Sequence, residues 1–144
     1  MDKPQQTDSA KLYFNIREKS FLVVAQTRQD SGMREEIGEP IRITDVAFDS
    51  RISDVLLDFL DSSRRTAHLS GKTRRYSDAE YSLFRKSHLA VSIERRPSGD
   101  LIIIPLHHSK GGFSGGYEEQ IIVSKDDVPA KIPSALREAF ILAT

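Results

Sequence analysis

The 144-residue chain contains no cysteine. This absence excludes disulfide bonds, thiolate nucleophiles and cysteine-based zinc sites, and it permits a reducing compartment. Long apolar runs are missing as well: none exceeds about five residues, whereas a membrane-spanning helix needs about 20. The amino terminus lacks the apolar stretch of a secretory signal. These absences make the cytoplasm the expected location.

Neither sign of charge is in excess. The chain carries 21 Lys and Arg residues against 21 Asp and Glu residues, so its formal net charge is zero. A general nucleic-acid-binding protein usually has a basic excess, and an acidic decoy that steers a basic partner from a distance needs a negative one. Neutrality argues against both roles for the chain as a whole and directs attention to local patches.

The size and composition are those of one ordinary globular domain. A chain of this length buries a core of its own without disulfides or metals. Its 38% hydrophobic and 29% charged residues are typical of such a domain. We therefore expect a flexible tail at residues 1–9 and a single domain at residues 10–144.

Apolar patterning predicts several short β-strands. Residues 11–17 alternate between apolar and polar side chains, as a strand with one buried face does, while residues 21–25 are apolar on both faces. A turn sequence at residues 97–100 joins two apolar segments and predicts a hairpin. The predicted strands are residues 11–17, 21–25, 40–43, 89–95, 101–105 and 121–123, with exposed loops at 27–39 and 107–117.

Three helices are predicted between and after these strands. Residues 50–62 carry apolar side chains at i, i+3, i+4, i+7 and i+8. Ser77 and Glu80 form a capping box that starts a second helix, and Pro133 suits the first turn of a third. Since the strands mostly pair as hairpins with helices between them, we expect an α+β fold. It would be a single domain whose mostly antiparallel or mixed sheet is covered by about three helices.

The segment from His107 to Tyr117 is the most distinctive stretch. It holds four of the eight glycines, yet it matches neither phosphate-binding glycine motif, because Lys110 precedes the glycines and no helix opens after them. His107, His108 and Lys110 suggest acid–base chemistry, but neighbouring side chains on a strand point to opposite faces. A mobile turn and a partner-contacting loop are the other interpretations, and the aromatic residues Phe113 and Tyr117 favour partner contact.

Carboxylates gather at two places. Asp54, Asp58 and Asp61 share the outer face of the predicted helix 50–62, which is either a solvated face or an acidic docking patch for a basic protein such as a nuclease. Glu118 and Glu119 are sequence neighbours that diverge, so they do not form a catalytic pair. No histidine spacing indicates a metal site, and we expect no cofactor.

A basic run links the first two predicted helices at residues 64–75. It contains Arg64, Arg65, Lys72, Arg74 and Arg75. Such runs are usually solvated loops, and the alternative is a surface that holds nucleic-acid phosphates.

The chain resembles bacterial contact-dependent growth-inhibition immunity proteins, most closely over residues 101–142. An early aromatic strand and a mid-chain helix followed by basic residues also fit that pattern. Two departures stand out: the glycine loop has no tryptophan, and the closing helix has no glycine near its start. The segments that carry the resemblance are Leu101-Ile102-Ile103-Ile104-Pro105, the glycine loop, Tyr117-Glu118-Glu119-Gln120-Ile121-Ile122-Val123, Val128-Pro129-Ala130-Lys131-Ile132-Pro133 and Leu136-Arg137-Glu138-Ala139-Phe140.

The resemblance implies a cytoplasmic antidote with no enzymatic activity. Such proteins bind the carboxyl-terminal toxin domain of a cell-surface exoprotein, often a nuclease acting on tRNA or DNA, and block its activity without contacting nucleic acid or membrane. A small RNase-like enzyme using His107, His108 and Lys110, or a nucleic-acid-binding module at residues 64–75, are the alternatives. On the immunity interpretation, the residues expected to contact the toxin are Asp54, Asp58, Asp61, Phe113, Tyr117, Glu118 and Glu119.

Overall fold

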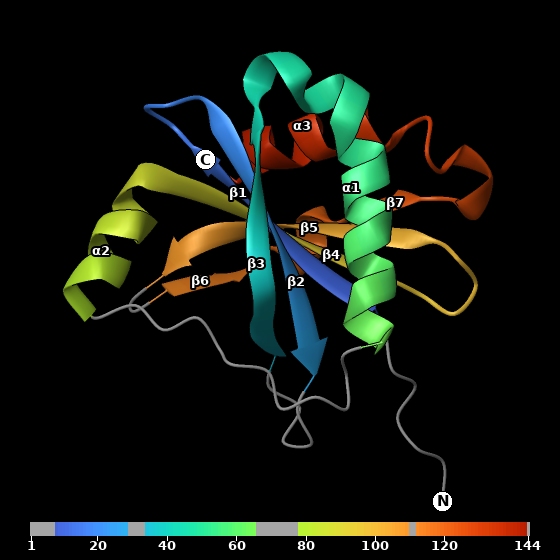
Figure 1. Cartoon of the computed structure of the whole chain (residues 1–144), viewed down its shortest axis with the longest axis horizontal. Coiled ribbons are helices and arrows are strands. Elements are labelled where there is room, and N and C mark those ends of the chain that lie inside the picture. Colours follow the sequence, from blue (N-terminus) through green and yellow to red (C-terminus); the bar gives the residue numbers. More distant parts are fainter. Residues whose placement is uncertain (1–7, 29–33, 66–77, 110–111, 144) are drawn as a thin grey trace, which may run out of the picture.

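Seven strands form one antiparallel sheet in the computed structural model, which describes residues 8–28, 34–65, 78–109 and 112–143 (Figure 1). Their order across the sheet is β3-β2-β1-β4-β5-β6, and β7 also pairs with β5. The predicted α+β fold with an antiparallel sheet is confirmed. The strands are β1 (Asp8–Asn15), β2 (Ser20–Arg28), β3 (Arg34–Thr44), β4 (His88–Arg95), β5 (Leu101–Ser109), β6 (Gly112–Gly115) and β7 (Ile121–Val123).

Three α-helices accompany the sheet. The helices α1 (Asp45–Arg65) and α3 (Ile132–Leu142) pack on one face, called the first face below (Figure 1). The helix α2 (Asp78–Ser87) instead contributes Phe84 to the cluster on the opposite, second face. Two short 3-10 helices, η1 (Tyr117–Glu119) and η2 (Lys125–Asp127), flank β7. In this described part of the chain, no helix is both long and apolar enough to cross a bilayer.

The main core lies between the first face and the helices α1 and α3. Leu12 and Val23 of the sheet, Leu56 of α1 and Leu136 of α3 are all fully buried there. Complete burial of such a side chain contributes about 1.5–3 kcal/mol relative to exposure. The periodic apolar stripes of α1 and α3 therefore explain why both helices cover the same face.

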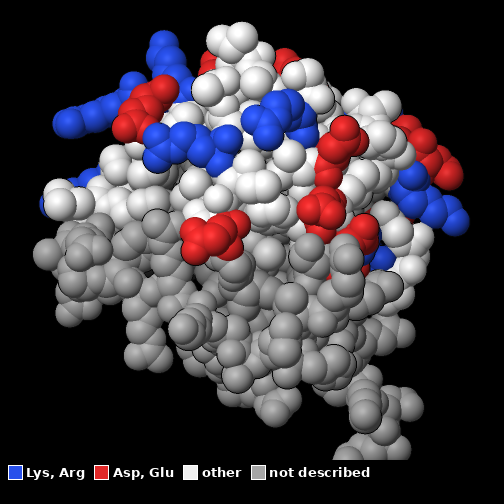
Figure 2. Space-filling view, in the orientation of Figure 1, with Lys and Arg blue, Asp and Glu red and all other residues white. Residues whose placement is uncertain are grey.

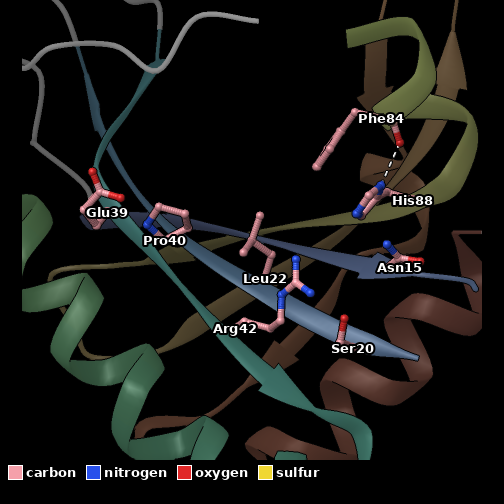
Figure 3. Close-up of a pocket in the computed structure, with 8 residues that line it drawn as sticks. All are labelled: Asn15, Ser20, Leu22, Glu39, Pro40, Arg42, Phe84 and His88. Atoms are coloured by element: carbon pink, nitrogen blue, oxygen red, sulfur yellow. Dashed lines mark hydrogen bonds between the residues drawn. The ribbon is translucent and has the colours of Figure 1, made fainter. Parts of the chain in front are cut away.

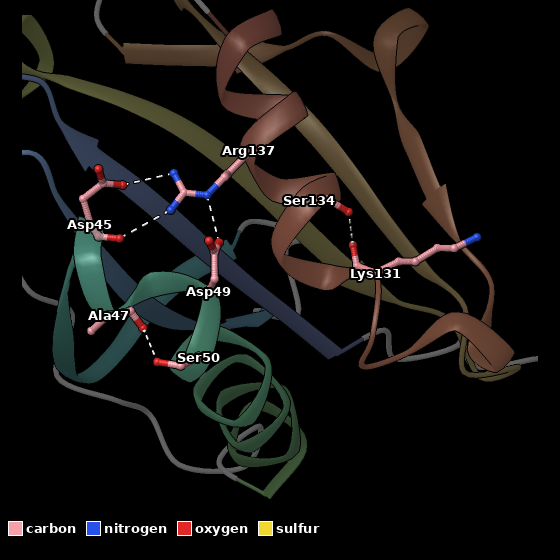
Figure 4. A network of polar contacts seen from close by, with 7 residues as sticks. All are labelled: Asp45, Ala47, Asp49, Ser50, Lys131, Ser134 and Arg137. Atoms are coloured by element: carbon pink, nitrogen blue, oxygen red, sulfur yellow. Dashed lines mark hydrogen bonds and ion pairs between the residues drawn. The ribbon is translucent and has the colours of Figure 1, made fainter.

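Arg137 of α3 links the two helices (Figure 4). Its Nη1 donates to Asp45 Oδ1 at 3.0 Å and its Nε donates to Asp49 Oδ1 at 2.9 Å. The guanidinium also lies 4.9 Å from the ring centroid of Phe48. Arg137 thereby fixes the start of α1 against α3.

The outer edge of β5 pairs with two short strands placed end to end. Leu106 of β5 pairs with Gly115 of β6, and Ile102 pairs with Ile122 of β7. The helix η1 lies in the segment that connects β6 to β7. At the start of this segment, Gly116 N donates a hydrogen bond to Pro105 O at 2.9 Å, which holds the segment against β5.

Several boundaries differ from the sequence prediction. The sheet begins at Asp8 rather than after a tail ending at residue 9, because Asp8 accepts hydrogen bonds from Arg95, and Ser9 Oγ donates to Gln26 at 2.8 Å. The predicted loop 27–39 contains the end of β2 and the start of β3, since an edge strand tolerates a polar sequence. The helix α1 begins at Asp45, where Thr44 Oγ1 accepts a hydrogen bond from Ala47 N at 3.3 Å.

The predicted loop 107–117 also contains regular structure. The strand β5 continues through Ser109, and Gly112–Gly115 forms β6. Glycine-rich sequence concealed this strand because glycine is disfavoured in strand interiors. The capping residue predicted for α2, Ser77, lies outside the described residues.

Candidate functional site

The predicted acidic face of α1 is present. Asp54, Asp58 and Asp61 are exposed on the helix, and Figure 2 shows acidic groups following one another over the surface at α1. Asp61 differs from Asp54, however, because its Oδ1 accepts a hydrogen bond from Arg95 Nη2 at 2.7 Å.

Arg95 of β4 also holds the first residue of β1. Its Nε donates to Asp8 Oδ2 at 2.8 Å, and the Asp8 side chain is only 2% exposed. Burial acts to lower the pKa of Arg95, but the hydrogen bonds to Asp61 and Asp8 outweigh it and raise the pKa above its ordinary value. Asp61 is therefore part of an internal ion-pair network as well as part of the acidic face.

Three other predicted residues form the short helix η1. Tyr117 is 67% exposed and Glu118 is exposed, whereas Glu119 is half-buried and its Oε1 lies 2.6 Å from His107 Nε2. The ring of Tyr117 lies over Gly115, where an added Cβ would come within 2.7 Å of a ring carbon. Glycine at this position therefore allows the tyrosine to lie flat against the strand.

Phe113 lies on the second face rather than on an exposed loop. Its ring centroid is 6.0 Å from that of Tyr13 and 5.0 Å from that of His108, and Lys11 Nζ lies 5.6 Å from it. Phe113 is half-buried in this cluster. Only part of its ring is available to a partner.

The seven predicted residues thus fall into separate groups. The three aspartates lie on α1, over the first face, and Phe113 lies on the second face. Tyr117, Glu118 and Glu119 lie together at the outer edge of β5. Each acidic group is carried by its own element, the aspartates by α1 and the glutamates by η1.

The two adjacent histidines do not share a site. His107 contacts Glu119, whereas His108 Nε2 contacts the carbonyl oxygens of Arg85 and His88 at 2.6 and 3.0 Å. His107 and His108 are adjacent residues of β5, and successive side chains on a strand point to opposite faces of the sheet. Lys110 and the side chains of the basic run at 64–75 lie outside the described residues.

A pocket of about 450 Å³, which the sequence did not predict, lies on the second face near α2 (Figure 3). His88 Nδ1 lies 2.8 Å from the backbone oxygen of Phe84, and the His88 and Phe84 rings stack with their centroids 3.8 Å apart. The other ring nitrogen of His88 faces the pocket (Figure 3). Burial lowers the pKa of His88, against the backbone hydrogen bond, so a neutral ring is favoured. The pocket is lined by Asn15, Ser20, Leu22, Glu39, Pro40, Arg42, Phe84 and His88.

No sequence motif could have identified this pocket, because its residues come from five different elements. Asn15 and Ser20 flank a turn, Arg42 is near the end of β3, and His88 directly follows α2. Within the described ranges, no three His, Asp or Glu side chains gather closely enough to hold a metal ion.

No protein-family model matches this sequence, and no curated protein sequence matches it. Solved structures do share its fold, including the following two. A protein of unknown function from Neisseria meningitidis is 17% identical, with a TM-score of 0.71 and full coverage of both chains. A chain of the CdiA-CT/CdiI toxin and immunity complex from Yersinia pseudotuberculosis is 15% identical, with a TM-score of 0.71, and the match covers 99% of this chain and 100% of that one.

The two similarities extend over the whole domain. The correspondence therefore covers the whole fold rather than a single shared hairpin or helix. At such low identity the correspondence concerns the fold, and side chains at a binding surface can differ completely between proteins of one fold. The contacts of this chain's own side chains are therefore the basis for assigning roles to individual residues.

Proposed function

We propose that this chain is an immunity protein that binds and neutralises a toxin domain of a contact-dependent growth-inhibition system. The observation that carries the proposal is the full-length similarity of fold to a chain of the CdiA-CT/CdiI toxin and immunity complex. The sequence resemblance over residues 101–142 independently favours the immunity side of such a pair. Fold alone does not fix function, so the two observations support the proposal together.

The proposed activity is binding, without chemistry of its own. The geometry supports this, because His107 and His108 point to opposite faces of β5 and each contacts a different internal partner. Neutralisation would consist of covering the toxin's active site in a stoichiometric complex. Its affinity would come from a few well-packed side chains rather than from the net charge of zero.

A nuclease is the toxin class that best fits the charged surfaces. A nuclease must bind phosphates with basic side chains, and carboxylates on an inhibitor complement such a groove. This neutral chain concentrates exposed carboxylates on α1 and around η1. We therefore propose a toxin that cleaves RNA or DNA and has a basic active-site surface.

Co-expression tests the proposal. The tagged chain would be produced together with the carboxyl-terminal toxin fragment encoded immediately upstream of it, and growth and co-elution would be measured. We expect growth to be restored and the two proteins to elute as one complex of equal stoichiometry. Continued growth arrest together with separate elution would contradict the proposed function.

Expression of the chain alone supplies the matched control. An immunity protein leaves growth unchanged when the toxin is absent, whereas a toxin-side protein arrests growth by itself. Growth arrest by the isolated chain would therefore assign it to the toxin side of the pair. Loss of that arrest in a His107→Ala variant would favour the enzymatic alternative.

A further inference from the structure

Two large apolar side chains are exposed along the outer edge of β5. Tyr117 is 67% exposed and Ile122 is 53% exposed. Ile122 pairs with Ile102, and Gly115, on which the Tyr117 ring lies, pairs with Leu106. Directly paired residues of neighbouring strands project to the same face, and Ile102 and Leu106 both belong to the second face.

The two exposed side chains therefore share one surface. Ile102 and Leu106 are four residues apart on β5, which corresponds to about 13 Å along the strand. This distance fits easily within one partner's half of a typical protein interface, about 800 Å². We call Tyr117, Glu118 and Ile122 the edge patch.

The structure holds the backbone that leads into the edge patch close against β5. Gly116 N donates to Pro105 O, and an added Cβ at Gly116 would lie only 2.9 Å from that oxygen, so the connection to η1 lies close against β5. At the other end of η1, Glu119 contacts His107 across 2.6 Å. A backbone segment that is already ordered loses less entropy on binding, which favours the use of the side chains it carries as anchors.

The chain segment that carries the edge patch is acidic in sequence. Residues 117–127 contain four acidic side chains and one basic side chain, so their net charge is −3. The acidic residues are Glu118, Glu119, Asp126 and Asp127, and the basic residue is Lys125. An apolar centre with a charged rim is the usual anatomy of a protein interface. The negative charge of this segment complements a basic partner.

The acidic face of α1 lacks such an anchor. Among the described residues of α1, the large exposed hydrophobic side chain is Val46, in its first turn and far along the helix from Asp58. Asp61 is also engaged by Arg95. Isolated surface carboxylates contribute little to affinity without a desolvated centre.

We propose that the edge patch, rather than the acidic face of α1, is where the toxin binds, with Tyr117 and Ile122 as its anchors. This inference rests on the proposed function and specifies the surface through which it operates. The partner it fits is a basic protein surface that offers an apolar depression for the tyrosine ring. Glu118 meets a basic side chain of that surface.

Calorimetric titration with the purified toxin fragment encoded upstream tests the assignment. Tyr117→Ala and Ile122→Thr should each weaken binding by about 25-fold or more, as expected of interface hot spots. Val46→Ala, which removes a 98% exposed side chain at the start of α1, is the matched control and should leave the dissociation constant unchanged. Circular dichroism melting curves verify that each variant folds.

The outcomes separate the two proposals. If the wild-type chain binds and protects while Tyr117→Ala and Ile122→Thr bind equally tightly, the edge assignment is overturned and the proposed function stands. If the wild-type chain neither binds nor protects, both are overturned. Should Ile122→Thr melt early, Glu118→Lys on the exposed part of η1 replaces it. If Glu118→Lys then bound the toxin with the affinity of the wild type, the assignment of the edge patch as the binding surface would also be contradicted.

Discussion

Arg95 joins an exposed carboxylate to a buried one: its Nη2 donates to Asp61 at 2.7 Å while its Nε donates to Asp8 at 2.8 Å. Asp61 lies on α1 and Asp8 begins β1, so the arginine ties the first strand to the helix that covers the sheet. The Asp8 side chain is 2% exposed, whereas that of Asp61 is 53% exposed. The two contacts therefore differ in their energetic consequences.

Replacement of Arg95 by methionine should destabilise the protein by about 3 kcal/mol, because it removes the guanidinium that pairs with the buried Asp8 carboxylate. Asp61→Asn should cost about 1 kcal/mol or less, since the exposed partner is well solvated. Urea denaturation of both variants measures the difference. Equal losses of unfolding free energy in the two variants would show that Asp8 does not depend on Arg95.

Gly115 and Gly116 provide a matched pair for the edge of β5. Gly116→Ala should lower the unfolding free energy by about 1–3 kcal/mol, because its Cβ would lie 2.9 Å from the backbone oxygen of Pro105. Gly115→Ala should cost less than about 1 kcal/mol, because the exposed Tyr117 ring can rotate away from the new methyl group. Urea denaturation compares them, and a costlier Gly115→Ala would mean that the ring is held firmly in place.

Much of the fold followed from periodicity. The apolar stripe of residues 50–62 predicted the buried side of α1, and the turn at residues 97–100 predicted the β4–β5 hairpin. These features are local, so they can be recognised from neighbouring residues. Residues 34–39 and 112–115 gave no such signal, because they lie at the two edges of the sheet, where polar residues and glycines are tolerated.

The surfaces were less predictable than the fold. Sequence spacing placed Asp54, Asp58 and Asp61 on one helix face, but the engagement of Asp61 by Arg95 depends on a contact 34 residues away. The shared face of Tyr117 and Ile122 follows only from the register of β6 and β7 against β5. The pocket around His88 likewise arises from elements that meet only in the folded chain.

Reversal of one charge on α1 distinguishes steering from contact. With the edge patch as the binding surface, Asp54→Lys should slow association with the basic toxin by less than about tenfold at low salt and leave dissociation unchanged. This difference should shrink at high salt, where charges more than about 10 Å apart are screened. Stopped-flow kinetics at two salt concentrations measures both rates. Faster dissociation of the variant complex would place Asp54 inside the interface.

The half-buried His88 predicts how stability depends on pH. Burial lowers the pKa of His88 in the folded chain, in spite of the hydrogen bond to Phe84 and the nearby Glu18, whereas in the unfolded chain it stays near 6.5. Between the two pKa values the unfolded chain binds more protons, so this contribution to stability is lost as the pH falls from 6.5 through the folded pKa. Urea denaturation at pH 7.5 and 5.0 should show a larger loss for the wild type than for His88→Gln, because the other three histidines are common to both proteins. Equal losses would mean that His88 is protonated as easily in the folded chain as in the unfolded one.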